Sequence, residues 1–445
     1  MKKTKSTISI ILAVLMLLTP MFTLQAQSAE ITDSVANTSS MPVYQDFLDA
    51  VMDEYDISGV AYFTKNGRVL CQSARGMQNT KENRPITMDS LFCIGSVSKQ
   101  FCATAVLMLH EQGKLSLNDT LDKYFPEYTS GKAITIDHLL AMRSGIRDIV
   151  NTDYSYRGHE YPTEEYTLLA NATEEENNKI VTDWLFTQKL KFTPGLAFSY
   201  SNSNYFLLSL IIEQVTGMHY QSFIKENILE PLNMTNTGFF AELKDSPDLV
   251  EDCIPEDEPI EEIMLIVSVS SKGCGDLVSN AYDMDKWLTS LSNNTLLSEE
   301  SYKKLTTGYS NTEGVKYGYG LFIDPDNGIF YHGGNALTYE SVALTCPDDD
   351  YNVFMVTNDV DSVSKLGLSM TIIARAMTEQ INTDVMFGDV DGDGDISIID
   401  ATAIQLHVAQ LQPISDDLAM YGDTDNDGDI SVMDATAIQL FIAGL

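Results

Sequence analysis

A serine and a lysine, Ser96 and Lys99, stand three positions apart where a loop leads into an apolar helical pattern. On a helix, that spacing places the two side chains on one face, a turn apart. Acyl transfer needs a nucleophilic oxygen, a base that takes its proton, and N–H donors for the oxyanion. A serine at the start of a helix also supplies its own backbone N–H. The segment therefore predicts a serine nucleophile paired with a lysine base.

The spacing alone is a weak signal, because S-x-x-K arises by chance about once or twice in a chain of this size. The same four letters recur from Ser362 to Lys365, without a glycine before the serine and with no matching groups after them. We interpret the second copy as an ordinary helix start. The first copy is followed, in order, by Tyr200-Ser201-Asn202 and by His332-Gly333-Gly334.

Taken singly, these later groups have simpler interpretations. A Tyr-Ser-Asn sequence before an apolar helix is typical of a helix cap, in which Asn202 or Asn204 would bond the first N–H groups. His332 alone would more often be a packed strand residue than a catalytic one. The order of all three groups is what favours an acyl-transfer site.

The three groups resemble the S-x-x-K, Y-x-N and K-T-G or H-x-G motifs of the serine β-lactamase and penicillin-binding protein superfamily. The branch they resemble contains the class C enzymes and the D-Ala-D-Ala carboxypeptidases. The surrounding phrases His138-Leu139-Leu140, Thr193-Pro194-Gly195 and residues 204–217 are similar to stretches typical of that branch. The resemblance covers most of residues 41–380.

The resemblance implies a role for each motif residue. The catalytic residues would be Ser96 as nucleophile, Lys99 as a partly neutral base, and Tyr200 as proton shuttle. Substrate and oxyanion binding would fall to Asn202, His332, Gly333, Gly334 and Asn335, with the backbone N–H groups of Ser96 and Asn335 forming the oxyanion hole. Lys99 can act as a base only if its surroundings lower its pKa by several units from about 10.4. Catalysis would need no cofactor.

His332 stands where a K-T-G motif has a lysine. A histidine has an ordinary pKa near 6.5 and is mostly neutral at pH 7, so it offers no fixed cation to a substrate carboxylate. Strong β-lactamase activity is therefore not the favoured expectation, and peptides, esters and amides all remain open. Gly333 and Gly334 fit a strand edge that substrate approaches closely.

The predicted elements give these motifs a scaffold. Strand-like runs flank Asn66-Gly67, a dipeptide typical of a tight hairpin, and further strand-like runs occupy 329–332, 341–345 and 352–357. An amphipathic run covers 43–55, and helical patterns cover 98–112, 204–216, 282–291 and 362–380. Strands at both ends of one domain with helices between them predict an α+β fold, with an antiparallel sheet flanked by helices around a mainly helical insert.

The C-terminal segment contains an internal duplication, in which residues 388–406 recur as 422–440. Aspartates at loop positions 1, 3, 5 and 12, with glycine at position 6, suit Ca²⁺. The duplicated loop-plus-helix resembles a type I dockerin, which implies a small all-α domain, two structural calcium sites and a cohesin domain of a scaffoldin as partner. The predicted metal ligands are Asp389, Asp391, Asp393, Asp395, Asp400, Asp423, Asp425, Asp427, Asp429 and Asp434.

Composition sets the remaining expectations. A formal charge of -37 argues against nucleic acid as a partner. Basic residues, an apolar run and small residues near position 28 predict a secretory signal, so we expect a secreted protein that is not held in a membrane. The predicted divisions are 1–29, a signal peptide; 30–383, the hydrolase domain; and 384–445, the dockerin. Six cysteines are too sparse for a disulfide-built scaffold, and most are expected to be buried thiols.

Together these patterns predict a secreted serine hydrolase that acts through an acyl-enzyme on a peptide, ester or lactam carbonyl and is anchored to a cellulosome-type scaffoldin. Two alternatives remain open: a carboxylesterase for acylated polymers, and a catalytically silent binding module attached through its dockerin.

Overall fold

A computed structural model describes residues 56–149, 172–251, 271–312, 315–325, 328–336, 338–358, 396–414 and 430–443, with isolated residues in 45–53 and 388–422. The chain divides into two compact units, which are described separately. The predicted signal peptide, the final helix over 362–380 and the second S-x-x-K copy lie outside the described residues. So do most of the predicted calcium ligands and Cys253.

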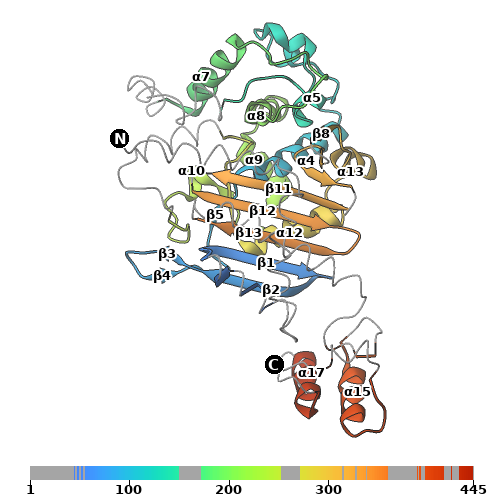
Figure 1. Ribbon diagram of the computed structural model, residues 1–445. Helices are drawn as coiled ribbons and strands as arrows, with labels where there is room; N and C mark the ends of the chain where they lie inside the picture. The colour runs from blue at the N-terminus through green and yellow to red at the C-terminus, as the bar shows by residue number, and fades with distance from the viewer. Residues whose placement is uncertain are drawn as a thin grey trace, which may run out of the picture. The chain divides into compact units, whose positions relative to one another are not determined.

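An antiparallel sheet forms the centre of the larger unit. Its eight strands lie in the order β2-β1-β13-β12-β11-β10-β9-β8. Strand β1 (Gly59–Lys65) pairs with β13 (Tyr351–Thr357) along its whole length. Figure 1 shows this closure as the blue strand β1 beside the orange strand β13. The predicted sheet, which joins strands from both ends of the domain around a helical insert, is confirmed.

The remaining strands of this sheet vary in length. They are β2 (Arg68–Arg75), β8 (Ser310–Thr312), β9 (Val315–Tyr317), β10 (Phe322–Asp324), β11 (Ile329–Ala336) and β12 (Tyr339–Cys346). The β1–β2 turn contains Asn66 and Gly67 with φ of 50° and 70°, the left-handed conformation that an Asn-Gly hairpin requires. Strands β8, β9 and β10 were not expected, because runs of three residues carry little periodicity.

Two small sheets accompany the large one. One consists of β3 (Met77–Asn79) and β4 (Arg84–Pro85), and the other of β5 (Phe92–Cys93), β7 (Leu277–Ser279) and β6 (Gly238–Phe239). The second matters for function, because β5 leads directly into the turn that carries Ser96. In this sheet, Phe92 pairs with Ser279 and Cys93 with Val278.

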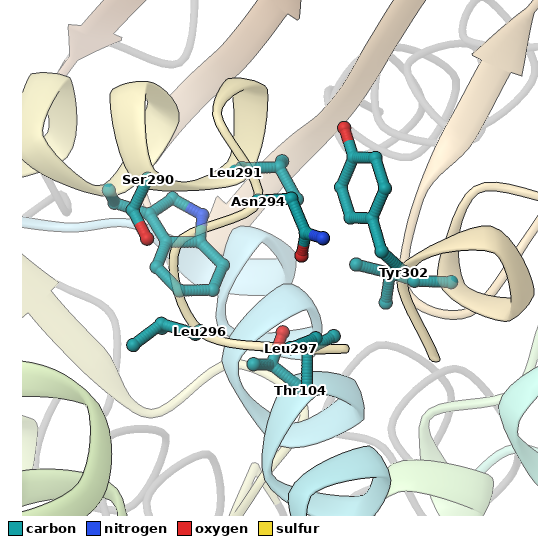
Figure 2. A pocket seen from close by; sticks show the side chains of 9 residues that line it. Thr104, Ser290, Leu291, Asn294, Leu296, Leu297 and Tyr302 are labelled. Atoms are coloured by element: carbon teal, nitrogen blue, oxygen red, sulfur yellow. The ribbon is translucent and has the colours of Figure 1, made fainter. Parts of the chain in front are cut away.

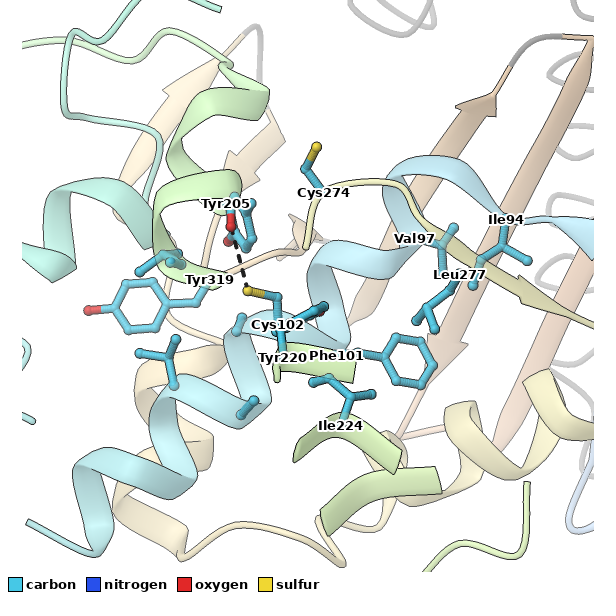
Figure 3. Close-up of a cluster of buried hydrophobic side chains, with 14 of the residues drawn as sticks. Ile94, Val97, Phe101, Cys102, Tyr205, Tyr220, Ile224, Cys274, Leu277 and Tyr319 are labelled. Carbon is cyan, nitrogen blue, oxygen red and sulfur yellow. Dashed lines mark hydrogen bonds between the residues drawn. The ribbon is translucent and has the colours of Figure 1, made fainter. Parts of the chain in front are cut away.

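The predicted helices over 98–112, 204–216 and 282–291 are present, and each buries an apolar face. The described α-helices of the larger unit number eight. They are α4 (Ser98–Glu111), α5 (Ile136–Leu140), α7 (Glu174–Thr187), α8 (Asn202–Thr216), α9 (Tyr220–Ile224), α10 (Phe240–Leu243), α12 (Ala281–Ser292) and α13 (Glu299–Leu305). Three short 3-10 helices, η1 (Gly95–Val97), η2 (Leu121–Lys123) and η3 (Thr129–Ala133), and one π-helical segment, η4 (Lys225–Leu229), accompany them. Helix α4 is the centre of this core, and Figure 3 shows its Phe101 and Cys102 packed among Tyr205, Ile224 and Leu277.

The C-terminal unit contains two described helices, α15 (Ile398–Val408) and α17 (Val432–Ala443), which pack against each other. Their shared core consists of Val390, Ala401, Ile404, Ile414, Ala435 and Ile438. Ala401 and Ile404 are matched by Ala435 and Ile438 in the second repeat, so the duplication buries equivalent positions. Among the described residues, no helix combines the length and the apolar character needed to cross a membrane.

Candidate active site

Ser96 lies on η1, the turn between β5 and α4, and its side chain is partly exposed while its neighbours are buried. Gly95 has a φ of 50°, and a Cβ there would lie 2.6 Å from the backbone nitrogen of Asn335 on β11. The Ser341 hydroxyl of β12 donates to the Ile94 carbonyl at 2.8 Å and holds the same turn. The glycine before the serine is therefore needed both for backbone conformation and for the approach of β11.

Lys99 occupies the first turn of α4, and its side chain is fully buried. Its Nζ donates to Ser96 Oγ at 2.9 Å, to Asn202 Oδ1 at 2.7 Å and to the carbonyl oxygen of Cys274 at 2.7 Å. These three acceptors match the three N–H groups of an ammonium. The structure therefore places the predicted base in direct contact with the predicted nucleophile.

Burial lowers the pKa of Lys99 to about 8, although the nearby Cys274 and Asp148 oppose the change. Desolvation penalises the charged amine, and the three oxygens only partly compensate. With that pKa, about a tenth of the lysine is neutral at pH 7. An ordinary lysine would be neutral in less than about one molecule in a thousand at that pH.

Tyr200 lies next to both groups. Burial of the phenol raises the pKa of Tyr200 well above its ordinary value, although a hydrogen bond with the Ser96 side chain lowers it. The Lys99 ammonium is 4.9 Å from the centroid of the Tyr200 ring. The phenol therefore stays protonated near neutral pH and can serve as a proton donor. Lys99 is the better candidate for the base, because part of it is neutral at that pH.

Asn202 opens α8, but it does not cap the helix. No side chain caps this helix start, and the Asn202 side chain points instead to Lys99 and to the buried carboxylate of Asp148. Asn204 bonds the Ser144 hydroxyl at 2.6 Å. The alternative interpretation of Tyr-Ser-Asn as a cap is therefore wrong, because these amides are used for tertiary contacts.

His332 is buried on β11 and is 2% exposed. Burial, together with the charge of Lys99, lowers the pKa of His332 to about 3. Its Nδ1 donates to the Gly333 carbonyl at 2.6 Å, which leaves Nε2 to accept from the Tyr317 hydroxyl at 3.3 Å. Both ring nitrogens thus have protein partners. The neutral imidazole lies beside Tyr200, with the two ring centroids 6.0 Å apart, and it offers no cation.

Strand β11 lies between β10 and β12 in the large sheet. Its pairing with β10 ends at Tyr331, while its pairing with β12 runs from Phe330 to Ala336. Asn335 is exposed in the C-terminal half of the strand. A Cβ on Gly334 would lie 1.9 Å from the Ile94 carbonyl oxygen. The close approach expected at Gly334 is therefore made by the chain's own Ser96 turn.

Sequence reasoning missed two groups at the site, the Asp148 carboxylate and the Cys274 carbonyl. Cys274 lies in a turn in which Gly273 has a φ of 72° and donates its N–H to Asp276 Oδ1 at 3.2 Å. Burial raises the pKa of Asp276 to about 7. The clustered glycines at 273 and 275 were the available signal for this turn, but a backbone carbonyl leaves no residue signature.

Two other features are not sites for a ligand. Among the described residues, Glu174, Glu213 and His219 have metal-ligating atoms close together, but the ammonium of Lys272 already pairs with both carboxylates. A small hollow between α4, α12 and α13, shown in Figure 2, has a volume of about 10 Å³, enough for about one water. None of the predicted catalytic residues lines it.

The described part of the C-terminal unit fits a cation-binding loop. Asp400 is fully buried, and its carboxylate accepts the backbone N–H groups of Val390, Asp391 and Ser397 at 2.8, 3.3 and 2.8 Å. The last loop position is thus tied back to the start of the loop. Asp434, also fully buried, accepts from Ser431 in the second repeat. These carboxylates suit Ca²⁺ in chemistry and position.

The fold and the Ser-Lys-Tyr arrangement define a serine hydrolase of the penicillin-binding-protein type. The Beta-lactamase family matches residues 45–374, and the Dockerin type I domain family matches residues 387–443. The chain therefore belongs to the beta-lactamase family of serine hydrolases and carries a type I dockerin domain at its C-terminal end.

Individual relatives agree with this assignment. The chain is 28% identical over 324 residues to a putative penicillin-binding protein, PbpX of Bacillus subtilis, covering 71% of this chain and 74% of that protein. It is 27% identical over 310 residues to protein flp of Staphylococcus aureus, covering 66% of this chain and 58% of that protein.

Two solved structures share the fold. The penicillin-binding protein of Bacillus halodurans has a TM-score of 0.62 at 24% identity, covering 74% of this chain and 99% of its own. The D-amino acid amidase of Ochrobactrum anthropi has a TM-score of 0.60 at 18% identity, covering 75% of this chain and 99% of its own.

Proposed function

We propose that the protein is a secreted hydrolase that cleaves peptide, amide or ester bonds through an acyl-enzyme on Ser96. The observation that carries this proposal is the 2.9 Å contact between Lys99 Nζ and Ser96 Oγ in a buried setting that lowers the pKa of Lys99 to about 8. A nucleophile in contact with a partly neutral base meets the main requirement for acylation.

The reaction follows from these contacts. Ser96 Oγ attacks the carbonyl carbon and its proton passes to the neutral Lys99 amine. The backbone N–H groups of Ser96 and Asn335, on two segments that touch at Gly95, receive the oxyanion. Tyr200 donates its proton to the leaving group and takes a new proton from the Lys99 ammonium. Water then attacks the acyl-enzyme and releases the acid, with the proton returning through the same groups.

The site favours neutral or small substrates over lactams that carry a carboxylate. His332 is buried, and its pKa of about 3 keeps it neutral at physiological pH. It cannot act as the fixed cation that a lysine would provide at this position. Amides of D-amino acids and short acyl esters therefore remain the two leading substrate classes.

A comparison of initial rates would separate these classes. Purified protein would be given a C-terminally amidated D-alanyl-D-alanine peptide, which carries no carboxylate, and p-nitrophenyl acetate, with Ser96→Ala as the control for each. We expect Ser96-dependent hydrolysis with at least one of them, and the faster substrate identifies a peptidase or an esterase. Absence of Ser96-dependent hydrolysis and of any covalent adduct would favour a silent binding module.

The dockerin suggests where the enzyme works. We propose that it binds a cohesin domain of an extracellular scaffoldin and that residues 1–29 direct export. Thr402 and Gln405 on α15 are exposed, as are Thr436 and Gln439 on α17. The residues that precede them, the pairs 398–399 and 432–433, are large apolar side chains that are 56–58% exposed. The duplication thus presents two similar apolar and polar faces.

Either face is expected to bind the cohesin after a half-turn of the dockerin. The variants Thr402→Ala/Gln405→Ala and Thr436→Ala/Gln439→Ala should each keep affinity within about threefold of the wild type, because the other face compensates. Combining all four substitutions should abolish binding in calorimetry. Loss of binding in only one double variant would show that a single face is used.

A further inference from the structure

We propose that Asp148 is a positioning residue that directs the lone pair of the Lys99 amine at Ser96 Oγ, by fixing the orientation of the Asn202 side-chain amide. This inference rests on the proposed acyl-enzyme function and concerns the same site. Asp148 follows the Ser144-Gly145 turn and is 4% exposed, so its carboxylate acts inside the protein.

The orientation of the amide follows from donor and acceptor chemistry. Asn202 Nδ2 donates to both carboxylate oxygens of Asp148, at 3.2 and 3.0 Å. A carboxylate only accepts hydrogen bonds, so the amino end of the Asn202 side chain must face Asp148. The amide oxygen is thereby turned to Lys99, where it accepts from Nζ at 2.7 Å.

The direction of the lysine lone pair follows in turn. A neutral amine has two N–H groups and one lone pair. The two carbonyl oxygens beside Nζ, Asn202 Oδ1 and the backbone oxygen of Cys274, can only accept, so they take the two N–H groups. The remaining neighbour is the Ser96 hydroxyl, which can donate. The lone pair therefore points at the proton that the base must remove.

A reversed amide would undo this arrangement. Its amino group would face Nζ, repel the ammonium form, and donate to the lone pair of the neutral form. The lysine would then lose its contact with the Ser96 proton. Because the carboxylate of Asp148 cannot donate, it disfavours that reversed state. The Asn202 side chain consequently acts on Lys99, and because it is only 6% exposed, it has little contact with substrate.

Asp148 also contributes charge. The ionisable groups that face Lys99 are Ser96, Cys102, Asp148, Tyr200, Tyr205, Cys274, Asp276 and His332. Of these, Asp148 and Asp276 are the carboxylates, and both act to raise the pKa of Lys99 against the effect of burial. Neutralising Asp148 therefore lowers the pKa of Lys99 further. The acidic limb of the pH–rate profile, where acylation slows because Lys99 is protonated, then moves to lower pH.

Asp148→Asn is the first test, because the substitution keeps size and burial but adds a donor that permits either amide orientation. The acylation burst with p-nitrophenyl acetate is expected to fall about 10- to 100-fold at its plateau, since small losses of alignment cost that much. The acidic limb should move to lower pH and KM should change little. In an Asn202→Ala background, the same substitution should have almost no further effect on the plateau.

A charge-swapped variant, Asp148→Asn with Asn202→Asp, sharpens the test. Here the new carboxylate beside Lys99 can only accept, so the lone pair again faces Ser96 and the plateau should recover at least about tenfold over Asp148→Asn. The negative charge is now closer to Lys99, so the acidic limb should move to higher pH. The two variants thus shift the limb in opposite directions, and the swap stays informative if the single variant fails to fold.

Ser144→Ala is the matched control. It removes a buried hydrogen bond to Asn204 between the same two segments, without contact to Lys99. This variant should lose stability and leave the acidic limb in place. An active wild type whose Asp148→Asn variant keeps both rate and limb, or whose swap moves the limb to lower pH, overturns the inference. A wild type that forms no Ser96 adduct overturns the proposed function itself.

Discussion

Replacing Lys99 with methionine is expected to reduce the acylation rate by about 10³-fold, because the variant keeps an unbranched buried side chain but has no base for the Ser96 proton. In the wild type, the rate should rise with pH, reach half of its plateau near pH 8, where burial sets the pKa of Lys99, and level off above about pH 9. Below that pH the amine gains a proton and loses its lone pair. The fall in rate at acidic pH therefore reports the protonation of Lys99 in the free enzyme. The rate of adduct formation between pH 5 and 9 measures both effects.

The control for this prediction is Lys272→Met. Lys272 is also buried, and its ammonium pairs with Glu174 and Glu213 away from the nucleophile. That variant should be less stable, while its pH profile should keep the wild-type limb. A Lys99→Met enzyme that retains the limb near pH 8 would show that another group is the base.

Removing calcium from the full-length protein is expected to unfold the dockerin repeats while the hydrolase domain stays folded. The described core of the two repeats contains few large side chains, and the carboxylates within each acidic loop repel one another without a cation. At a calcium concentration 1,000 times the dissociation constant, binding stabilises the folded state by about 4 kcal/mol. A chelator should therefore remove one calorimetric transition and leave the second unchanged.

Asp400→Asn with Asp434→Asn provides the internal comparison. Each substitution keeps the buried shape but removes one predicted oxygen ligand of Ca²⁺ and one carboxylate acceptor. The double variant should lose the calcium-dependent transition at calcium concentrations that saturate the wild type. A chelator that lowers the melting temperature of the hydrolase domain instead would contradict the separation of the two units.

The parts of the site on regular elements could be predicted, and the parts on irregular backbone could not. Ser96 and Lys99 share one helical turn, so their spacing alone predicts their meeting. The hairpin at Asn66-Gly67 and the strands around residues 330, 343 and 354 carry the periodicity of buried sheet. Local patterns were sufficient for these elements.

The groups around Lys99 required the fold itself. Asp148 lies 54 positions before Asn202, and only the packing of its loop against α8 brings the two together. The Cys274 carbonyl acts through its backbone, so the residue type there does not mark the contact. Gly334 belongs to the H-x-G motif and Gly95 precedes the nucleophile, but the steric need for both glycines comes from the close contact between β11 and the Ser96 turn.

Intact-mass spectrometry followed by peptide mapping tests the acyl-enzyme most directly. Wild-type protein treated with a fluorophosphonate ester should gain the mass of one adduct, and the modified peptide should carry it on Ser96. The Ser96→Ala protein should stay unmodified under the same conditions. Equal labelling of both proteins, or an adduct on a different serine, would contradict the assignment of Ser96 as the nucleophile.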